Sequence, residues 1–143
     1  YAALLANSGR TKTPHVLQGY IEGIKNIDYN IEYKDKIANI SQRTFDIVRE
    51  GMFKVVNGYG TARHIKLPNI NIAGKTGTSQ NPHGEDHALF IAFAPYENPK
   101  IAVAVIVENV GFGGTHAAPI AQKVIKAYLE NIEGNNFTIS SAN

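Results

Sequence analysis

Two strand-length apolar runs lie close together in the second half of the chain, at His87–Ala94 and Ile101–Val107. Only Pro95–Lys100 separates them. A link this short favours an antiparallel hairpin, because parallel strands need a longer crossover connection. Along both runs, neighbouring residues that point to opposite faces are apolar. Both strands are therefore expected to be covered on both faces, and helices are the expected covers.

Two helices are predicted before this hairpin. Tyr1–Ala6 consists of helix formers and runs into Asn7-Ser8-Gly9, a C-terminal stop, so it is expected to end a helix that began upstream. Ser41 is suited to cap a second helix, which ends at Asn57-Gly58. The face of that helix that we expect to be buried consists of Phe45, Val48, Met52, Val55 and Val56.

A third helix is predicted at Ala117–Ile132, with Pro119 in its first turn and Gly134 beyond its end. Residues 135–143 are small and polar, and are expected to form a flexible tail. Between residues 14 and 33, short apolar pairs alternate with polar residues, which favours one or two exposed strands. The expected fold class is α/β in the α+β sense, an antiparallel sheet flanked by helices.

The composition argues against several classes of partner and site. The 143 residues include 14 Lys and Arg and 12 Asp and Glu, so the formal charge is +2, and no run of basic residues is present. A nucleic-acid partner is therefore not expected. There is no cysteine, which excludes a disulfide framework and a thiolate metal site. The longest apolar stretches fall far short of the roughly 20 residues of a membrane-spanning helix, so any anchor is expected outside this segment.

The chemistry is expected at Lys75-Thr76-Gly77-Thr78, which follows the alternating residues of a predicted strand at Ile70–Gly74. A strand edge offers backbone donors and acceptors to an extended peptide. Lys75 would place a positive charge there, Gly77 would allow close backbone approach, and Thr76 and Thr78 would share one face. The tripeptide alone is not specific, since an edge lysine also serves to block aggregation.

The surrounding residues make the pattern more specific. The segments concerned are Tyr1–Gly9, Thr13–His15, Gly74–Gln80, Asp86–Pro95, Val105–Asn109 and Ala117–Ala121. Together they resemble the C-terminal portion of class B penicillin-binding proteins, in particular the elongation-type penicillin-binding protein 2. The resemblance covers nearly the whole chain. It implies that residues 1–143 are the C-terminal part of a single transpeptidase domain with a partial β-lactamase-like fold.

The resemblance also implies an activity for the parent protein, a serine-type D,D-transpeptidase that binds penicillin and cross-links peptidoglycan through an acyl-enzyme. Thr76 and Thr78 would bind the terminal carboxylate of the substrate, or that of a β-lactam, on a strand that includes Gly77. The backbone N–H of Thr78 would be half of the oxyanion hole. Lys75 would hydrogen-bond the serine of the family's Ser-x-Asn element. No cofactor is implied.

The partners implied are peptidoglycan stem peptides, β-lactam antibiotics, the remainder of the transpeptidase domain and proteins of the cell-elongation machinery. The implied location is the bacterial inner membrane, with the domain facing the periplasm and the anchor outside this chain. Two other classes of protein remain open. One is a non-catalytic penicillin-sensing or partner-binding domain that kept the Lys-Thr-Gly strand, and the other is a serine β-lactamase.

The family's Ser-x-x-Lys nucleophile is absent from this sequence. None of the serines is followed by a lysine three residues later: Ser8, Ser41, Ser79, Ser140 and Ser141. The nucleophile is therefore expected outside this chain. A Ser-x-Asn match at 141–143 follows Lys75 in sequence, whereas the family's element precedes it, and the match is interpreted as coincidence. Val110-Gly111 also stands where the family often has Gly-Gly.

Two weaker patterns lie beside the motif. His83, Glu85 and His87 would project to one side of a regular strand, as metal ligands do, but the intervening proline and glycine favour a solvated loop and no metal. Ser79, Asp86 and His87 contain the side-chain types of a hydrolase triad. Ser79 lacks the Gly-x-Ser-x-Gly turn that exposes such a nucleophile, so a separate hydrolase site is not expected.

Overall fold

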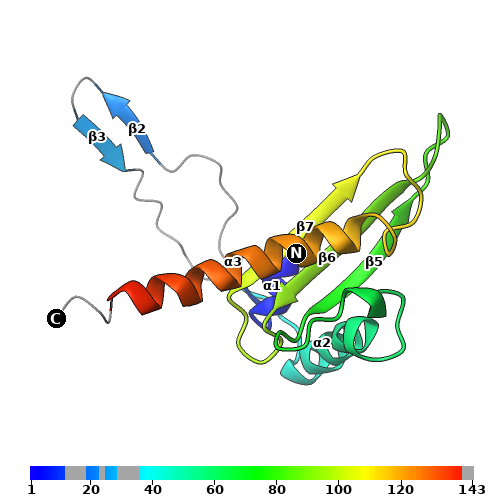
Figure 1. Cartoon of the computed structure of the whole chain (residues 1–143), viewed down its shortest axis with the longest axis horizontal. Helices are drawn as coiled ribbons and strands as arrows, with labels where there is room; N and C mark the ends of the chain where they lie inside the picture. The colour runs from blue at the N-terminus through cyan, green and yellow to red at the C-terminus, as the bar shows by residue number, and fades with distance from the viewer. Residues whose placement is uncertain (12–18, 23–24, 29–35, 140–143) are drawn as a thin grey trace.

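The structure is a computed structural model that describes residues 1–11, 19–22, 25–28 and 36–139 (Figure 1). Its elements in chain order are α1 (Ala2–Ala6), β1 (Arg10–Thr11), β2 (Gly19–Glu22), β3 (Lys25–Asp28), β4 (Lys36–Ile37), α2 (Gln42–Asn57), η1 (Arg63–Ile65), β5 (Ala73–Ser79), β6 (His87–Ala94), β7 (Ile101–Val107) and α3 (Ala117–Ile139). Antiparallel pairing joins β1 to β4, β2 to β3, and β5, β6 and β7 into a three-stranded sheet.

β6 is the central strand of the three-stranded sheet, with β5 on one side and β7 on the other. The bounds of β6 and β7 agree with the predicted hairpin, and their antiparallel pairing is confirmed. β5 begins at Ala73, later than the predicted start at Ile70. In the register of β5 with β6, Thr76 lies opposite Phe90 and Gly77 lies opposite Leu89.

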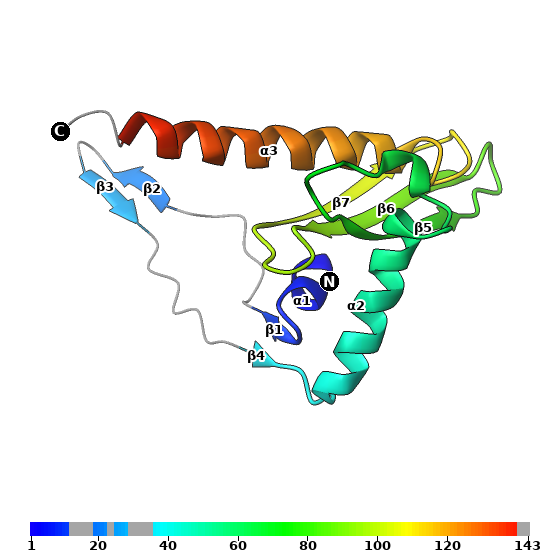
Figure 2. The ribbon, with the colours of Figure 1, turned by 60° about the horizontal axis from the view of Figure 1, so that its bottom comes forward.

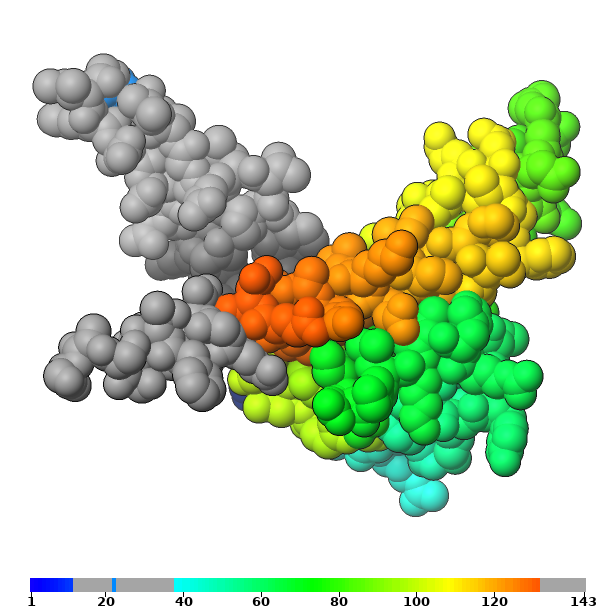
Figure 3. All heavy atoms as spheres, viewed as in Figure 1, coloured from blue at the N-terminus to red at the C-terminus, as the bar shows by residue number. Residues whose placement is uncertain are grey.

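Helices cover both faces of this sheet, which confirms the predicted layers. α3 packs on one face, where Phe90, Ala92 and Ile125 are fully buried in the larger of two hydrophobic clusters. α1 and α2 pack on the opposite face, where Phe45 and Phe93 belong to the second cluster (Figure 2). In the space-filling view, α3 in orange lies against the green segment that leads from η1 into β5 (Figure 3).

Ser41 caps α2 as predicted, because its Oγ accepts a hydrogen bond from the Thr44 N–H at 3.2 Å. Three residues of the predicted apolar face are buried: Phe45, Met52 and Val56. Val48 is 41% exposed, so the prediction that it is buried is wrong. It borders a hollow between the two N-terminal helices and the sheet instead of a filled core.

β7 is also less covered than predicted. Ala102, Ala104 and Ile106 lie on its α1 side and are exposed, Ile106 by 65%. α1 contacts β7, but α1 has 5 residues and β7 has 7. At about 1.5 Å per residue a helix advances less than half as far as a strand at about 3.3 Å per residue. α1 is therefore too short to cover this face.

α3 is longer than predicted, since it continues to Ile139. The predicted end near Ile132 is wrong, and residues 135–139 are helical instead of part of a tail. Gly134 costs a helix only about 1 kcal/mol relative to Ala, so it weakens the helix without ending it. Residues 140–143 lie outside the described part of the chain.

Near the N-terminus, one helix and one hairpin agree with the predictions. α1 agrees with the helix predicted at Tyr1–Ala6. The hairpin of β2 and β3 agrees with the strands expected between residues 14 and 33, and the other residues of that segment lie outside the described part. Within the described ranges, no helix has the length and apolar character needed to cross a bilayer.

Candidate active site

β5 carries Lys75, Thr76, Gly77 and Thr78 along an edge of the three-stranded sheet. Among the described strands, β6 is its hydrogen-bonded neighbour and no strand pairs with its other side. A free edge presents backbone N–H and C=O groups that can pair with an extended peptide. The motif therefore lies where such a peptide could bind as an additional strand.

The backbone N–H of Thr78 points toward this free edge. Lys75 Nζ donates a hydrogen bond to the Thr76 carbonyl oxygen at 2.6 Å, which indicates that this carbonyl is turned outward. Gly77 is paired with Leu89 of β6 in the register. In an antiparallel pair, both backbone groups of a residue point to one side, and alternate residues share that side. Thr76 and Thr78 therefore both direct their backbone groups away from β6.

The same alternation separates the side chains of the motif. Lys75 shares a face of the sheet with Ile91, on the side of α1 and α2, whereas Thr76 and Thr78 share the α3 side. The predicted common face of the two threonines agrees with this geometry. Lys75 and Thr78 are exposed, and Thr76 is half-buried.

Beside Lys75, a hollow of about 380 Å³ opens between α1, α2 and the sheet. Its walls are almost entirely apolar and include these residues: Tyr1, Leu5, Val48, Met52, Val55 and Ile91. Lys75 is its charged lining residue, so the hollow and the free edge of β5 form one continuous region.

Thr61, in the segment between α2 and η1, reaches the motif from another part of the chain. Its Oγ1 lies 3.0 Å from the Oγ1 of Thr76, which is hydrogen-bonding distance. Sequence reasoning missed this residue. The two threonines are 15 positions apart, and no periodic pattern in a Gly-rich loop indicates which side chain will meet a strand.

The loop between β7 and α3 packs directly on the motif. A Cβ added at Gly113 would overlap the carbonyl oxygens of Leu89 and Gly77 and lie 3.1 Å from Gly77 N. No residue larger than glycine fits there unless a strand moves. The Gly113 carbonyl oxygen in turn accepts from the N–H groups of Ala117 and Ala118, in the first turn of α3, at 3.1 and 2.9 Å. The backbone next to Thr78 is thus fixed from the side of α3.

Hydrogen bonds tie the turn between β5 and β6 to the same loop. Asn81 Nδ2 donates to Asn109 Oδ1 at 2.6 Å, and the Asn109 N–H donates to His87 Nδ1 at 3.1 Å. The Asp86 carbonyl oxygen accepts from the two N–H groups of residues 110–111, at 3.1 and 2.8 Å. His87 and Asp86 thus hold two loops together next to the motif.

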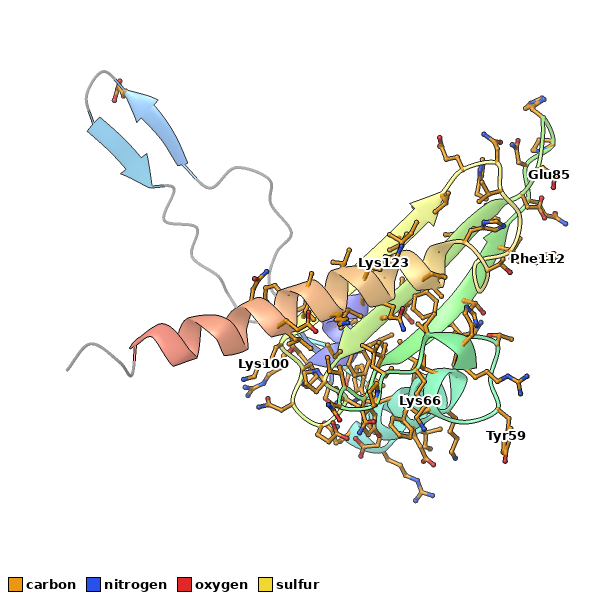
Figure 4. The ribbon with its side chains drawn as sticks, in the orientation of Figure 1. Tyr59, Lys66, Glu85, Lys100, Phe112 and Lys123 are labelled. Atoms are coloured by element: carbon orange, nitrogen blue, oxygen red, sulfur yellow. The ribbon has the colours of Figure 1, made fainter. Side chains whose placement is uncertain are left out.

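The two weaker patterns do not assemble into sites in the described residues. These residues hold no group of three or more His, Cys, Asp or Glu that could bind a metal ion, and Glu85 lies near the tip of the β5–β6 turn (Figure 4). Asp86 Oδ1 accepts from the Asn81 N–H at 3.1 Å. Within the described ranges, no side-chain hydrogen bond links Ser79 to Asp86 or to His87.

Residues 1–126 match the family described as the penicillin binding protein transpeptidase domain. The chain belongs to this family. Its curated relatives are longer proteins. The peptidoglycan D,D-transpeptidase MrdA of Haemophilus influenzae is 39% identical over 88% of this chain and 22% of that protein. The peptidoglycan D,D-transpeptidase PbpA of Mycobacterium tuberculosis is 38% identical over 90% of this chain and 28% of that protein.

Solved transpeptidase structures have the same arrangement of elements. Penicillin-binding protein A of M. tuberculosis, solved as an imipenem acyl-enzyme complex, aligns with a TM-score of 0.73 and 34% identity over 90% of this chain and 29% of that one. PBP2 of Pseudomonas aeruginosa, in complex with WCK 5153, aligns with a TM-score of 0.69 and 41% identity over 90% and 28%. The chain therefore has part of the penicillin-binding transpeptidase fold, as the resemblance implied.

Proposed function

We propose that this chain is part of a peptidoglycan D,D-transpeptidase that cross-links stem peptides and is acylated by β-lactams. The observation that carries the proposal is the free edge of β5, which presents Lys75, Thr76, Gly77 and Thr78 beside an open hollow. Family membership and the names of the curated relatives support it.

In this proposal the substrate lies along β5 as an added strand. The outward N–H of Thr78 donates to the oxyanion that forms when a nucleophile attacks the carbonyl carbon. A donor of this kind contributes about 3 kcal/mol to transition-state stabilisation. The hydroxyls of Thr76 and Thr78 bind the terminal carboxylate, and Gly77 leaves room for the substrate's backbone. Lys75 hydrogen-bonds the serine of a Ser-x-Asn element and adds positive charge.

The nucleophile is supplied by residues outside this chain, which spans 22% and 28% of two curated relatives. A serine Oγ attacks the carbonyl of the penultimate D-alanine, the terminal D-alanine leaves, and an amine of a second strand then takes the acyl group. We propose that the remainder of the transpeptidase domain covers the hollow beside Lys75. The exposed apolar side chain of Val48, which lines the hollow, supports this, because it would otherwise face water.

Location and further partners follow the same proposal. A transpeptidase acts on the cell wall, so the domain would face the periplasm and be held at the inner membrane by an anchor outside this chain. Proteins of the cell-elongation machinery would be its partners there. The support for this is the resemblance to elongation-type proteins together with the MrdA relative.

The proposal is tested with the full-length protein that contains this chain. Incubated with a fluorescent penicillin, it should form one covalent adduct per molecule, detected by intact-mass spectrometry. The adduct should be on a serine outside these 143 residues. Slow release of the acyl group would separate a transpeptidase from a β-lactamase, which hydrolyses it in turnover. Release of D-alanine from a stem pentapeptide in the presence of an acceptor amine would exclude a sensor. No adduct, or an adduct on Ser79, would contradict the proposal.

A further inference from the structure

The two threonines of the motif have different surroundings. Thr76 is half-buried, and its hydroxyl is within hydrogen-bonding distance of the Thr61 hydroxyl, at 3.0 Å. Thr78 is exposed, and no side-chain hydrogen bond joins it to another of the described residues. Thr76 therefore has an orienting partner before any substrate arrives, whereas Thr78 must find its orientation on binding.

Thr61 is itself held in place by its neighbours. A Cβ at Gly60 would overlap the backbone of Val55 in α2, with the Val55 carbonyl carbon at 2.7 Å, so Gly60 packs backbone to backbone on that helix. On the other side, Ala62 is fully buried, and its N–H donates to the Val55 carbonyl oxygen at 3.1 Å. Anchoring on both sides fixes the backbone position of Thr61, which is one requirement for a residue that orients another.

We propose that Thr61 is a positioning residue, which sets the Thr76 hydroxyl to donate its proton to the substrate's carboxylate. This inference rests on the proposed function. A hydroxyl has one proton to donate and two lone pairs that accept. When Thr61 donates to Thr76 Oγ1, the proton of Thr76 stays free for another acceptor. A carboxylate only accepts hydrogen bonds, so it needs that free proton.

The charge of the site favours a carboxylate next to Thr76. Lys75 Nζ donates a hydrogen bond to the Thr76 carbonyl oxygen, and it therefore places a positive charge next to Thr76. Hydrogen bonds in a chain polarise one another, so a proton donated by Thr61 makes the Thr76 O–H a stronger donor. Without Thr61, the Thr76 hydroxyl can rotate and must be ordered by the substrate alone. Thr61 therefore acts on substrate binding through Thr76, and it does not touch the reacting atoms.

The test uses the full-length protein and a fluorescent penicillin, whose carboxylate stands in for that of the stem peptide. Thr61→Val keeps the shape of the side chain and removes the hydroxyl, and it should lower the second-order rate constant of acylation roughly fivefold to tenfold, the loss expected for one net hydrogen bond. Thr61→Ser keeps the hydroxyl and should stay within about twofold of the unmodified protein. Melting temperatures should agree within about 2 °C.

A double-mutant cycle separates orientation from packing. If Thr61 acts through Thr76, the combined variant Thr61→Val with Thr76→Val should acylate no more slowly than Thr76→Val alone. The matched control is Thr115→Val in the loop before α3, where the described residues offer the side chain no hydrogen-bond partner. It should leave the rate unchanged.

Three results would overturn the inference while the proposed function stands: an unchanged rate in Thr61→Val, an equal loss in Thr61→Ser, or additive losses in the double variant. Each would mean that the Thr61 hydroxyl does not orient Thr76. Absence of any adduct in the unmodified protein is a different result, because it would remove the proposed function first.

Discussion

The ammonium group of Lys75 lies between the free edge of β5 and the apolar hollow under the sheet, and it donates to the Thr76 carbonyl oxygen. The side chain is exposed, so it adds little to the core. Lys75→Ala in the full-length protein should therefore lower the penicillin acylation rate by roughly tenfold or more, with a nearly unchanged melting temperature. Acylation kinetics and thermal unfolding, measured on the same preparations, check both parts.

Lys54→Ala is the matched control for this change. Lys54 is an exposed lysine of α2 that pairs with Glu50 at 2.5 Å, four residues away on the same helix. Exposed pairs of this type contribute only a few tenths of a kcal/mol. Acylation by Lys54→Ala should match that of the unmodified protein, and an equal rate in Lys75→Ala would contradict the role of Lys75.

Arg49 stabilises the fold at a point that sequence patterning did not indicate. Its guanidinium donates to the carbonyl oxygens of Leu5, at 3.0 Å, and of Ala6, and to that of Tyr96 at 2.9 Å. It also lies 4.8 Å from the ring centroid of Phe93. One side chain thus joins the end of α1, the helix α2 that carries it and the turn after β6.

Arg49→Lys should destabilise the full-length protein by about 1–3 kcal/mol, because lysine keeps the charge but loses the planar group that serves several acceptors. Urea unfolding, followed by circular dichroism, measures the change. The exposed Arg43 on the same helix provides the control, since Arg43→Lys should stay within about 0.5 kcal/mol. A loss at Arg49 no greater than at Arg43 would show that these contacts do not stabilise the fold.

At the scale of elements, the sequence predicted best where a local pattern determines the structure. β6 and β7 begin and end where their apolar runs do, and Ser41 caps α2 through a contact three residues away. It predicted worst where burial or a hydrogen-bond partner depends on an element that is distant in sequence. Whether Ile106 is covered depends on the length of α1, and the partner of Thr76 is in another loop. No single-segment pattern contains that information.

The β5–β6 turn should bind no metal ion. His87 Nδ1 accepts a hydrogen bond from the Asn109 N–H, so a metal at that nitrogen would have to break the link between the two loops. Tight zinc binding requires several ligands that are already in position, and the described residues of this turn do not form such a group. Purified protein should contain less than about 0.1 equivalent of zinc after dialysis, measured by plasma mass spectrometry. Zinc at one equivalent, lost in His83→Ala, would contradict this expectation.

At the scale of the whole molecule, the described part of the chain holds the proposed substrate-binding groups, and none of its serines has the family's nucleophile motif. Carboxylate-binding hydroxyls and an oxyanion donor stabilise a tetrahedral intermediate only after something has attacked the carbonyl. Ser79 is the serine of β5, and it pairs in register with His87, whose Nδ1 is occupied by the Asn109 N–H. Lysine does not follow Ser79 at the spacing that the family uses.

The 143-residue chain by itself should therefore form no covalent adduct with penicillin. It should also fold weakly, because Val48 and Ile106 leave apolar surface open on the α1 side of the sheet, where burial of each such side chain contributes about 1.5–3 kcal/mol. Intact-mass spectrometry after incubation with a fluorescent penicillin checks the first expectation, and urea unfolding checks the second. A stoichiometric adduct would mean that the chain contains its own nucleophile. In that case Ser79→Ala, which removes the hydroxyl on β5, would show whether Ser79 carries the acyl group.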